Sequence, residues 1–586
     1  MAKKINITVN NREYQVEEGN TIMEALDSIG FQIPRLCYHP KLTNEGSCRI
    51  CIVEVEGSQN YVTSCTHMVA DGMEIKTNSA ELRKARRDIL ELILDSHPFD
   101  CHTCENDGNC ELQRISKTVG VKVRHFEGEK KKFDLDLSSP SIVRDPNKCI
   151  LCGRCVRACR EIQGVNAIDF AGRGFNTTVL TAYNKPLDES VCSNCGQCIT
   201  VCPTAALSEK YHTHELFSEL SNEKKLKVVQ IAPAVRAAIG ESFGLKPGTR
   251  MEKQTVAALR KLGFDLVFDT QFAADLTIME EGSEFLERVT SNGVLPMITS
   301  CSPGWIKYCE QFFPELLPNL SSCKSPMSMM SSLIKTYYAK KIGKKPEDIL
   351  NAAVMPCTAK KYEAEREELG IDGNNMTDIV ITTRELAWMI QSAGIDLLTI
   401  KEEEFDNLFG SSSGAATIFG VTGGVMEAAL RTAYELYLGE TLVNIEFSEI
   451  RGFKGIKEAT VKMGDIDLKV AVAHGLGNAK ALLEIVKNDP QRFQFIEIMT
   501  CPGGCIGGGG QPYPGAGHYS MDEDLLKKRA SVLYGLDRGK TIRRSHENPE
   551  IQRIYKEFLG TPLSQKSHEI LHTKYKKKLP HGIYRK

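Results

Sequence analysis

Residues 493–510 read FQFIEIMTCPGGCIGGGG. Apolar residues fill most of the first seven positions, which is typical of a buried strand. The strand runs into a loop in which Cys501 and Cys505 stand among six glycines. Either an ordinary tight turn or a bulky inorganic group can explain a loop with so few side chains. Since glycine lets backbone amides approach an anion closely, the second explanation predicts a metal cluster against this loop.

The sequence around this strand alternates strands and helices from about residue 226 onward. Strand-like segments are KVVQIAP, DLVFDT, VLPMITSC, AAVMPC and LKVAVAHG, and helix-like segments are VAALRKLGF, MEAALRTAYELYL and NAKALLEIV. This alternation predicts an α/β domain with a largely parallel sheet. Three of the strands run into Cys301, Cys357 and Cys501, and α/β sheets normally carry their chemistry at the carboxyl ends of strands.

The composition points to metal rather than to nucleic acid, membrane or disulfides. The chain has 586 residues, 21 cysteines and a formal net charge of −2, which gives no indication of a nucleic-acid partner. No apolar run approaches the roughly 18 residues of a membrane span, and the N-terminus lacks an apolar signal core. We therefore predict a cytoplasmic protein. Cytosolic thiols stay reduced, so the clustered cysteines indicate metal sites.

An internal repeat gives the strongest metal signal. The runs CILCGRCVRAC (149–159) and CSNCGQCITVCP (192–203) share the spacing of bacterial two-cluster ferredoxins, in which the fourth cysteine serves the other cluster. This spacing predicts a domain over residues 126–210 with two 4Fe–4S clusters. The predicted ligands of the first are Cys149, Cys152, Cys155 and Cys202, and those of the second are Cys192, Cys195, Cys198 and Cys159.

The first 80 residues are expected to form a β-grasp ferredoxin-like domain. Alternating residues on both sides of Asn10-Asn11 predict a hairpin. Thr21 and Glu24 form a capping-box pair before an amphipathic helix that Gly30 ends. The predicted ligands of a 2Fe–2S cluster are Cys37, Cys48, Cys51 and Cys65. A structural zinc site is the alternative, because the first gap is longer than in plant-type ferredoxins.

Residues 81–125 hold a second amphipathic helix followed by a compact His/Cys group. Its predicted ligands are His97, Cys101, Cys104 and Cys110, with His102 as the competing histidine. Spacing alone does not separate zinc from a His-ligated 4Fe–4S cluster. The position between two iron–sulfur domains favours the cluster. Of the remaining cysteines, Cys309 and Cys323 carry no partner signal and are expected to be buried small side chains.

Three motifs in residues 211–586 closely resemble the iron-only (FeFe) hydrogenases, and the resemblance extends over nearly the whole chain. They are TSCSPGW (299–305), MPCTAKKYEAE (355–365) and EIMTCPGGCIGGGGQP (497–512). The order of accessory sites is similar to the long clostridial-type members. The resemblance implies a multidomain α+β and α/β protein with a large catalytic domain over 211–586, which ends in a C-terminal wrapping segment. It also implies reversible interconversion of hydrogen with protons and electrons.

The resemblance implies an H-cluster, which is a 4Fe–4S cube joined to a diiron site with CO, cyanide and an azadithiolate bridge. Cys357, Cys501 and Cys505 match ligands of the cube, with Cys505 as the link to the diiron site. Lys360 matches a lysine that hydrogen-bonds a cyanide. Pro233, Ala234, Met355, Phe419 and Met499 match neighbours of the diiron site. Met327 replaces a frequent glutamine, and Ala234 a frequent serine.

One departure from the family pattern concerns the first motif, where two adjacent cysteines are usual and this chain has Cys301-Ser302. Pro303 fixes the register, so Ser302 occupies the ligand position. Three alternatives follow: the Ser302 oxygen binds one iron, or the loop shifts so that Cys301 binds, or the cube has three thiolates and a weaker fourth ligand.

The same register implies a proton path that starts at the Cys301 thiol and passes outward through Glu281, Ser321, Glu284 and Arg288. From the residues alone, EEGSEFLER would be a solvent-facing helix. Glu281, Glu284 and Arg288 are spaced to share one helix face, and carboxylates, hydroxyls and thiols can pass protons stepwise.

Electron partners follow from the resemblance. Electrons would pass between the H-cluster and ferredoxin, or flavin/NAD(P)-binding partner subunits, since no nucleotide fingerprint is present in the chain. Maturation proteins would supply the diiron site. The alternative function is a hydrogen sensor or an iron–sulfur assembly protein on the same fold. The predicted proton path argues against it, and Ser302 keeps it open.

Overall fold

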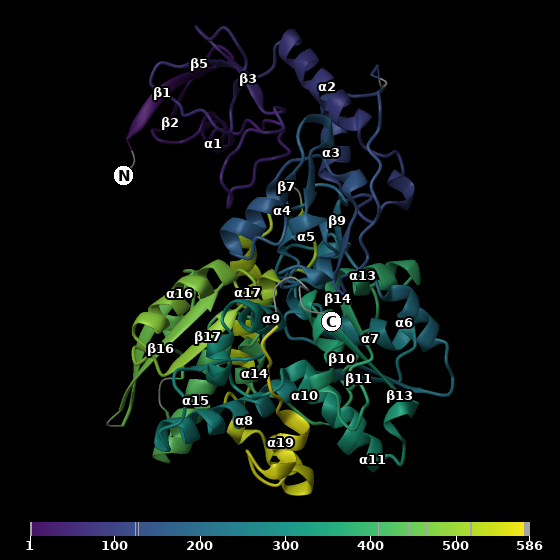
Figure 1. Cartoon of the computed structure of the whole chain (residues 1–586), viewed down its shortest axis with the longest axis vertical. Helices are drawn as coiled ribbons and strands as arrows, with labels where there is room; N and C mark the ends of the chain where they lie inside the picture. The colour runs from purple at the N-terminus through teal and green to yellow at the C-terminus, as the bar shows by residue number, and fades with distance from the viewer. Residues whose placement is uncertain are drawn as a thin grey trace.

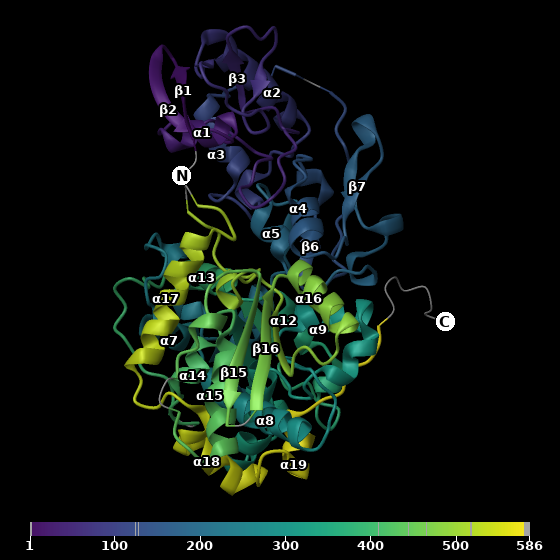
Figure 2. The same ribbon diagram turned by 90° about the vertical axis from the view of Figure 1, so that its left-hand side faces the viewer.

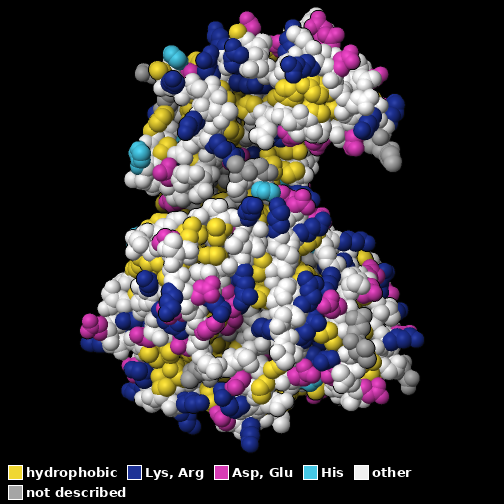
Figure 3. Space-filling view, turned by 180° about the vertical axis from the view of Figure 1, so that it is seen from behind, with side chains coloured by type: hydrophobic (Ala, Val, Ile, Leu, Met, Phe, Trp, Pro, Cys, Tyr) yellow, Lys and Arg dark blue, Asp and Glu magenta, His cyan; other side chains and the backbone are white. Residues whose placement is uncertain are grey.

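The structure is a computed structural model, and it describes residues 3–578 except 124, 127, 408, 443, 444, 465, 516 and 517. Small N-terminal domains lie at one end of the long axis and a large α/β domain lies at the other (Figure 1). The molecule narrows between them (Figure 3). In the part of the chain that is described, no helix is both long and apolar enough to cross a membrane.

The N-terminal region contains a five-stranded mixed sheet in the order β2-β1-β5-β3-β4. The predicted hairpin is present as β1 (Lys4–Val9) and β2 (Arg12–Glu17), with Asn10 and Asn11 at positive φ. Helix α1 (Ile22–Ser28) begins with the predicted capping box between Thr21 and Glu24. The other strands are β5 (Glu74–Lys76), β3 (Ile52–Val55) and β4 (Val62–Thr63).

The predicted second amphipathic helix is α2 (Ala80–Asp95), and α3 (Glu111–Val119) follows the His/Cys group. The internal repeat then produces the same backbone twice. Gly153 and Gly196 stand at equivalent positions with φ of 70° and 69°, and each precedes a short helix, α4 (Arg154–Arg157) or α5 (Gln197–Val201). The strands of this region are β6 (Ile142–Arg144) paired with β9 (Leu207–Glu209), and β7 (Asp169–Ala171) paired with β8 (Thr178–Leu180).

The chain from residue 226 onward contains two four-stranded sheets where the sequence predicted one largely parallel sheet. The all-parallel sheet has the order β11 (Leu266–Asp269), β10 (Leu226–Ile231), β13 (Ile349–Met355) and β14 (Ile379–Thr382). The second sheet has the order β12 (Met297–Ile298), β17 (Phe495–Met499), β16 (Ile466–His474) and β15 (Ile456–Met463), with only β15 antiparallel. The pattern of apolar residues in the strands did not predict which strands pair, nor that they divide into two sheets.

Helices pack around these sheets (Figure 2). The predicted helices are present as α7 (Glu252–Leu262), α15 (Gly424–Leu438) and α16 (Leu476–Asn488). Helix α8 (Gln271–Thr290), which contains EEGSEFLER, is mostly buried. The solvent-facing interpretation from residues alone was therefore wrong, because α8 packs against both α15 and α10 (Pro326–Leu333). This burial brings carboxylates into the interior of the catalytic region.

Candidate functional site

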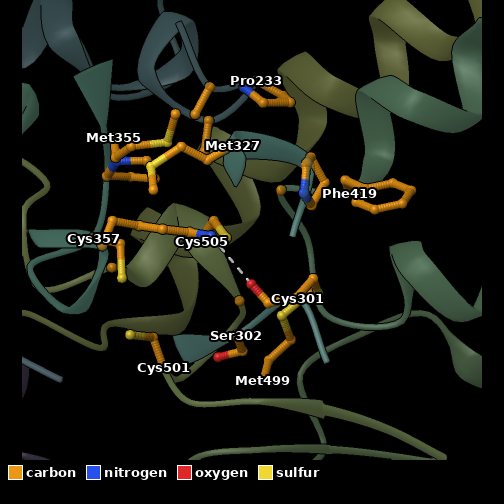
Figure 4. A pocket seen from close by; sticks show the side chains of 18 of the residues that line it. Pro233, Cys301, Ser302, Met327, Met355, Cys357, Phe419, Met499, Cys501 and Cys505 are labelled. Carbon is orange, nitrogen blue, oxygen red and sulfur yellow. Dashed lines mark hydrogen bonds between the residues drawn. The ribbon is translucent and has the colours of Figure 1, made fainter. Parts of the chain in front are cut away.

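Loops at the carboxyl ends of β12, β13 and β17 line one cavity between the two sheets (Figure 4). Cys301 and Ser302 follow β12, Cys357 follows β13, and Cys501 and Cys505 follow β17. The parallel strands point their carboxyl ends toward the same place, which is why residues about 200 positions apart meet. The residues that the resemblance placed around the diiron site all line this cavity: Pro233, Ala234, Met355, Phe419, Met499 and Lys360.

The structure shows why glycine is required in the 501–510 loop, which the sequence did not reveal. A side chain at Gly508 would collide with the carbonyl of Pro356, and one at Gly509 would collide with the carbonyl of Cys195. A side chain at Gly504 would meet the backbone of Val421 and Thr422. At these positions other protein backbone lies against the loop. The crowding is a meeting of three cysteine-bearing loops, and Gly504 and Gly508 also line the cavity.

This contact joins the ferredoxin-like repeat to the cavity. Thr358 Oγ1 donates to the carbonyl of Asn194 at 2.8 Å, and Gln197 Nε2 donates to the carbonyl of Gly507 at 3.0 Å. Arg384 donates to the carbonyls of Gly509 and Gln511, both at 2.6 Å, and pairs with Glu209 at 2.9 Å. The Cys195 loop is thus held directly against the loop that carries Cys501 and Cys505.

A row of polar side chains leads from Cys301 toward the protein surface. Glu281 lies on α8 and is fully buried; burial, and then the charge of Glu284, raise its pKa to about 8. Among the described residues, no donor lies within hydrogen-bond distance of either carboxylate oxygen of Glu281, although Ser321 and the backbone of Ser300 are near enough to lower its pKa slightly. Ser321 Oγ donates to Glu284 at 2.9 Å, and Arg288 Nη2 donates to Glu284 at 2.6 Å. Burial and the nearby Glu281 raise the pKa of the Cys301 thiol well above its usual value.

Glu280, the neighbour of Glu281 on α8, belongs to a separate network. Its carboxylate accepts hydrogen bonds from Tyr555 Oη at 2.6 Å and from the backbone N–H of Leu563 at 2.9 Å, and it pairs with His572 at 3.0 Å. These three partners come from the C-terminal segment, which wraps around α8. The two carboxylates are equally buried, but the hydrogen-bonding capacity of Glu280 is met by these partners and that of Glu281 is not.

Comparisons with known proteins agree with this arrangement. The family model for the iron only hydrogenase large subunit, C-terminal domain, matches residues 225–509. The chain is 49% identical to the NADP-reducing hydrogenase subunit HndD of Solidesulfovibrio fructosivorans, over 98% of this chain and 99% of that protein. It is 41% identical to iron hydrogenase 1 of Clostridium pasteurianum, over 97% of this chain and 100% of that protein.

The chain belongs to the iron-only (FeFe) hydrogenase family. It is an enzyme that interconverts hydrogen with protons and electrons, and its iron–sulfur domains relay the electrons. Among solved structures, this hydrogenase resembles apo FeFe hydrogenase HydA1 of Chlamydomonas reinhardtii, with a TM-score of 0.56 and 45% identity, over 63% of this chain and 99% of that chain. It is also 32% identical to the cytosolic Fe–S cluster assembly factor narfl of Xenopus tropicalis, but over 66% of this chain.

The remaining segments of the hydrogenase match further families. Residues 2–80 match a 2Fe-2S iron-sulfur cluster binding domain, and residues 523–578 match the iron hydrogenase small subunit. Residues 86–125 match the NADH-ubiquinone oxidoreductase-G iron-sulfur binding region. Residues 139–208 match the ferredoxin-like domain of NADH-quinone oxidoreductase subunit 3. Iron–sulfur binding domains therefore occupy most of the chain before the catalytic region.

The structure gathers the cysteines of this hydrogenase's accessory domains into the predicted groups. One cavity is lined by Cys149, Cys152, Cys155 and Cys202, and a second by Cys159, Cys192, Cys195 and Cys198. In the N-terminal sheet domain, Cys51 Sγ lies 3.4 Å from Cys65 Sγ, and Cys37 contacts both Cys48 and Cys65. A further cavity is lined by His97, Cys101, Cys104 and Cys110, whereas His102 is exposed.

The catalytic cavity of the hydrogenase suits an H-cluster. Burial raises the pKa of the Cys357 and Cys501 thiols and raises that of Cys505 to about 12. Thiolates at such positions need a positive partner, which the iron of a cube provides. The apolar lining by Met327, Met355 and Phe419 excludes water. Lys360 Nζ is held at 2.6 Å from Ser325 Oγ and 2.7 Å from Glu363, and it is a charged donor in the cavity wall.

Two residues around the cavity were missed by the sequence reasoning. Thr500 bonds to Ser302 through both its backbone and its hydroxyl. Gln511 Nε2 donates to the carbonyl of Ala234 at 3.2 Å and to that of Cys505 at 3.3 Å, which ties two sides of the cavity together. Both stand inside the third motif, so their position was a usable signal. Cys309 and Cys323 are fully buried, as predicted.

Proposed function

We propose that this hydrogenase consists of four domains, over residues 1–80, 81–125, 126–210 and 211–586, with one 2Fe–2S cluster, three accessory 4Fe–4S clusters and an H-cluster. The accessory ligands are the four groups of cysteines, with His97, that the structure brings together. Three of the four groups line separate cavities, and the fourth, Cys37, Cys48, Cys51 and Cys65, is clustered in the N-terminal sheet domain; both arrangements support the assignment. Each cavity has four soft or borderline donors, the number that an iron–sulfur cluster requires.

The contact between the Cys195 loop and the Cys501–Cys505 loop is the observation that carries this proposal. The cluster of Cys159, Cys192, Cys195 and Cys198 is the last relay before the catalytic cavity, because Gly509 packs on the Cys195 carbonyl. Electrons that enter at the 2Fe–2S or at the His-ligated cluster both reach the cavity through this relay. The two clusters of the internal repeat therefore have different roles, because only one of them lies next to the catalytic cavity.

Within the cavity, Cys357, Cys501 and Cys505 would hold the cube, with Cys505 on the side of the diiron site. The H-cluster supplies the hydrogen chemistry when it is bound. Lys360 lines the cavity and would be the donor to a cyanide of the diiron site, and Pro233, Ala234, Met355, Phe419 and Met499 would form the apolar surroundings of that site. Maturation proteins that build the diiron site are required partners in this proposal.

Protons reach the cavity through Arg288, Glu284, Ser321, Glu281 and finally the Cys301 thiol. The buried carboxyl of Glu281 is protonated at neutral pH because its pKa is raised to about 8. It can therefore give a proton toward Cys301 and regain one from Ser321 and Glu284. Its oxygens lack protein partners in the described chain, which suits a group that bonds transiently to water.

We propose a NAD(P)-binding flavin subunit as the electron partner in preference to ferredoxin. The relative HndD is named as a subunit of an NADP-reducing hydrogenase, and two accessory segments match NADH oxidoreductase domains. The test is the reduction of methyl viologen and of NADP⁺ by hydrogen. We expect the isolated chain to reduce the dye and not NADP⁺, and to reduce NADP⁺ once the flavin subunit is added. Reduction of NADP⁺ by the chain alone contradicts the proposal.

A further inference from the structure

We propose that the side-chain oxygen of Ser302 is the fourth protein ligand of the cube and that Thr500 stabilises it in the alkoxide form. This inference rests on the proposed function, in which Cys357, Cys501 and Cys505 hold the other three irons of the cube. The Cys301-Ser302 pair left three alternatives open, and this inference selects the first of them. Thr500, which stands inside the third motif but was assigned no role by the resemblance, becomes a positioning residue for the cube.

The first observation is the place of Ser302. It lines the same cavity as Cys357, Cys501 and Cys505, and it lies next to Cys501 and Met499 in Figure 4. A hydroxyl oxygen therefore stands with three thiols around the part of the cavity away from Phe419 (Figure 4). Four donors of this kind are the number that a 4Fe–4S cluster takes from a protein.

The second observation is a helix cap that is not used. Ser302 is the N-cap residue of α9 (Pro303–Phe312), with extended φ and ψ of −103° and 102°. Serine is favoured at this position because its oxygen normally accepts from an N–H of the first helical turn. Ser302 makes no such bond. The oxygen of this serine is therefore not used to cap the helix.

The third observation is the contact that Ser302 makes in place of the cap. The backbone N–H of Thr500 donates to Ser302 Oγ at 3.2 Å, and Thr500 Oγ1 lies 2.7 Å from the same oxygen. Two donors from one residue can therefore converge on Ser302 Oγ. Thr500 directly precedes Cys501, so the group that orients Ser302 is fixed to a ligand of the cube.

The chemistry of this arrangement balances without an electron transfer. When the oxygen binds iron during assembly of the cluster, the O–H bond of Ser302 would break and its proton would be released to the buffer, as happens whenever a protonated ligand binds a metal. The resulting alkoxide keeps both Thr500 hydrogen bonds, now with Thr500 Oγ1 as a donor. Hydrogen bonds to an ionised acceptor are about twice as strong as neutral ones. Thr500 thus favours the deprotonated, iron-binding form of Ser302 over the neutral form.

Hydrogen bonds around the first motif oppose a shift of the loop that would put Cys301 in the position of Ser302. Trp305 Nε1 donates to the carbonyl of Thr299 at 3.1 Å, and Ser300 Oγ donates to the carbonyl of Cys323 at 2.7 Å. These bonds hold the chain on both sides of the pair. Cys301 also lies near the fully buried Glu281, on the proton path. A shift that made Cys301 the ligand would break this part of the path.

The test is iron exchange in the full chain. Wild type, Ser302→Ala and Ser302→Cys are treated anaerobically with ferricyanide and a chelator, then with ⁵⁷Fe²⁺, and the ⁵⁷Fe bound per chain is counted. The accessory clusters contribute the same background in all three. An iron without a protein ligand exchanges readily, so we expect a single additional ⁵⁷Fe in Ser302→Ala. Wild type should match Ser302→Cys, in which all four ligands are thiolates.

Two results would overturn the inference. Additional ⁵⁷Fe in wild type equal to that in Ser302→Ala would mean that the fourth iron has no protein ligand. No additional ⁵⁷Fe in Ser302→Ala would mean that another residue, such as Cys301, is the ligand. Infrared bands of CO and cyanide from the same proteins after maturation test the proposed function separately. If wild type lacks these bands, the proposed function fails, whatever the exchange shows.

Thr500→Val tests the second half of the inference. This change removes the hydroxyl donor and keeps the backbone N–H. A lost bond to a charged acceptor predicts iron exchange roughly tenfold faster than in wild type. The same change in the Ser302→Cys background should have little effect, because sulfur is a weak acceptor. Equal acceleration in both backgrounds would assign Thr500 a general packing role and would contradict its proposed action on Ser302.

Discussion

The ferredoxin-like repeat and the catalytic cavity both gather cysteines, but they do so in different ways. In the repeat, eight cysteines come from two short runs, and Gly153 and Gly196 give both runs the same backbone. In the cavity, one cysteine follows β12, one follows β13 and two follow β17, and these three strands belong to two different sheets. Ligand spacing along the chain describes the first arrangement and does not describe the second.

The difference has a consequence for function. A cluster of the repeat depends on local chain geometry, so the loss of one ligand should impair one relay. The cavity depends on the packing of the sheets, on α8 and on the glycine loop, and it combines metal binding, proton delivery and exclusion of water. Changes in the two regions should therefore be separable by the choice of electron donor.

The largest effect is expected at a cube ligand. Cys501→Ala removes a thiolate from the group that performs the chemistry, so hydrogen evolution should fall by at least about 10³-fold with any donor. The assay uses reduced methyl viologen, and infrared spectra should show loss of the CO and cyanide bands. Cys309→Ala is the matched control, since Cys309 is buried without a proposed ligand role. Turnover by Cys501→Ala near the wild-type rate would contradict the assignment of the cavity.

Glu281→Gln should have the next largest effect. Removal of an acid–base group from a proton path predicts a loss of about 10²- to 10³-fold in hydrogen evolution. The CO and cyanide bands should be preserved, because Glu281 is not a ligand. The control is Glu280→Gln, an equally buried neighbour whose carboxylate is bound by Tyr555, Leu563 and His572. That variant should lose thermal stability and keep its rate of turnover per folded molecule, and equal loss of turnover in both would contradict the path.

The sequence predicted the features that depend on neighbouring residues. Residue spacing alone predicted which cysteines of the repeat lie together in two cavities, and the capping box of Thr21 and Glu24 was visible as a local pattern. The strands that lead to Cys357 and Cys501 were also recognisable, because buried parallel strands are continuous apolar runs. The cavity residues and the proton path came from the resemblance to a family.

Features that depend on distant packing were not predictable. The division of the catalytic strands into two sheets depends on which strands pair, and the apolar runs are alike in both. Residues 280–288 look amphipathic in the sequence, and the packing of α8 against neighbours such as α10 and α15 makes this stretch part of the interior, where Glu281 and Glu284 are buried. The glycines at 508 and 509 suggested a cofactor, whereas their closest neighbours are the backbones of Pro356 and Cys195.

Ligand changes in the accessory domains sharpen the comparison further. Cys159→Ala should impair the relay next to the cavity, and electrons from either starting cluster pass through it. Cys48→Ala should impair only the 2Fe–2S cluster. We expect at least about a tenfold lower rate of partner-dependent NADP⁺ reduction in Cys159→Ala and a smaller loss in Cys48→Ala, because the His-ligated cluster remains. An equal loss in both would indicate a single linear chain of clusters.

The smallest effect is expected from a change in pH. The pH dependence of hydrogen evolution by the wild-type protein tests the role of Glu281. With a pKa of about 8, Glu281 is neutral and can donate below that pH, and it ionises as the pH rises through it. The protonated fraction, and with it the rate of hydrogen evolution, should fall roughly fourfold between pH 7 and pH 8.5. Folding stability should change in the same direction. The folded chain keeps the proton of Glu281 up to about pH 8, whereas the unfolded chain loses it near the ordinary pKa of glutamate. The free energy of unfolding should therefore decrease as the pH rises between these two values. Since Gln does not titrate, both the inflection in rate and this part of the stability change should be absent in Glu281→Gln. An inflection near pH 8 that persists in that variant would assign the titration to another group and would leave Glu281 without a role in setting the pH profile.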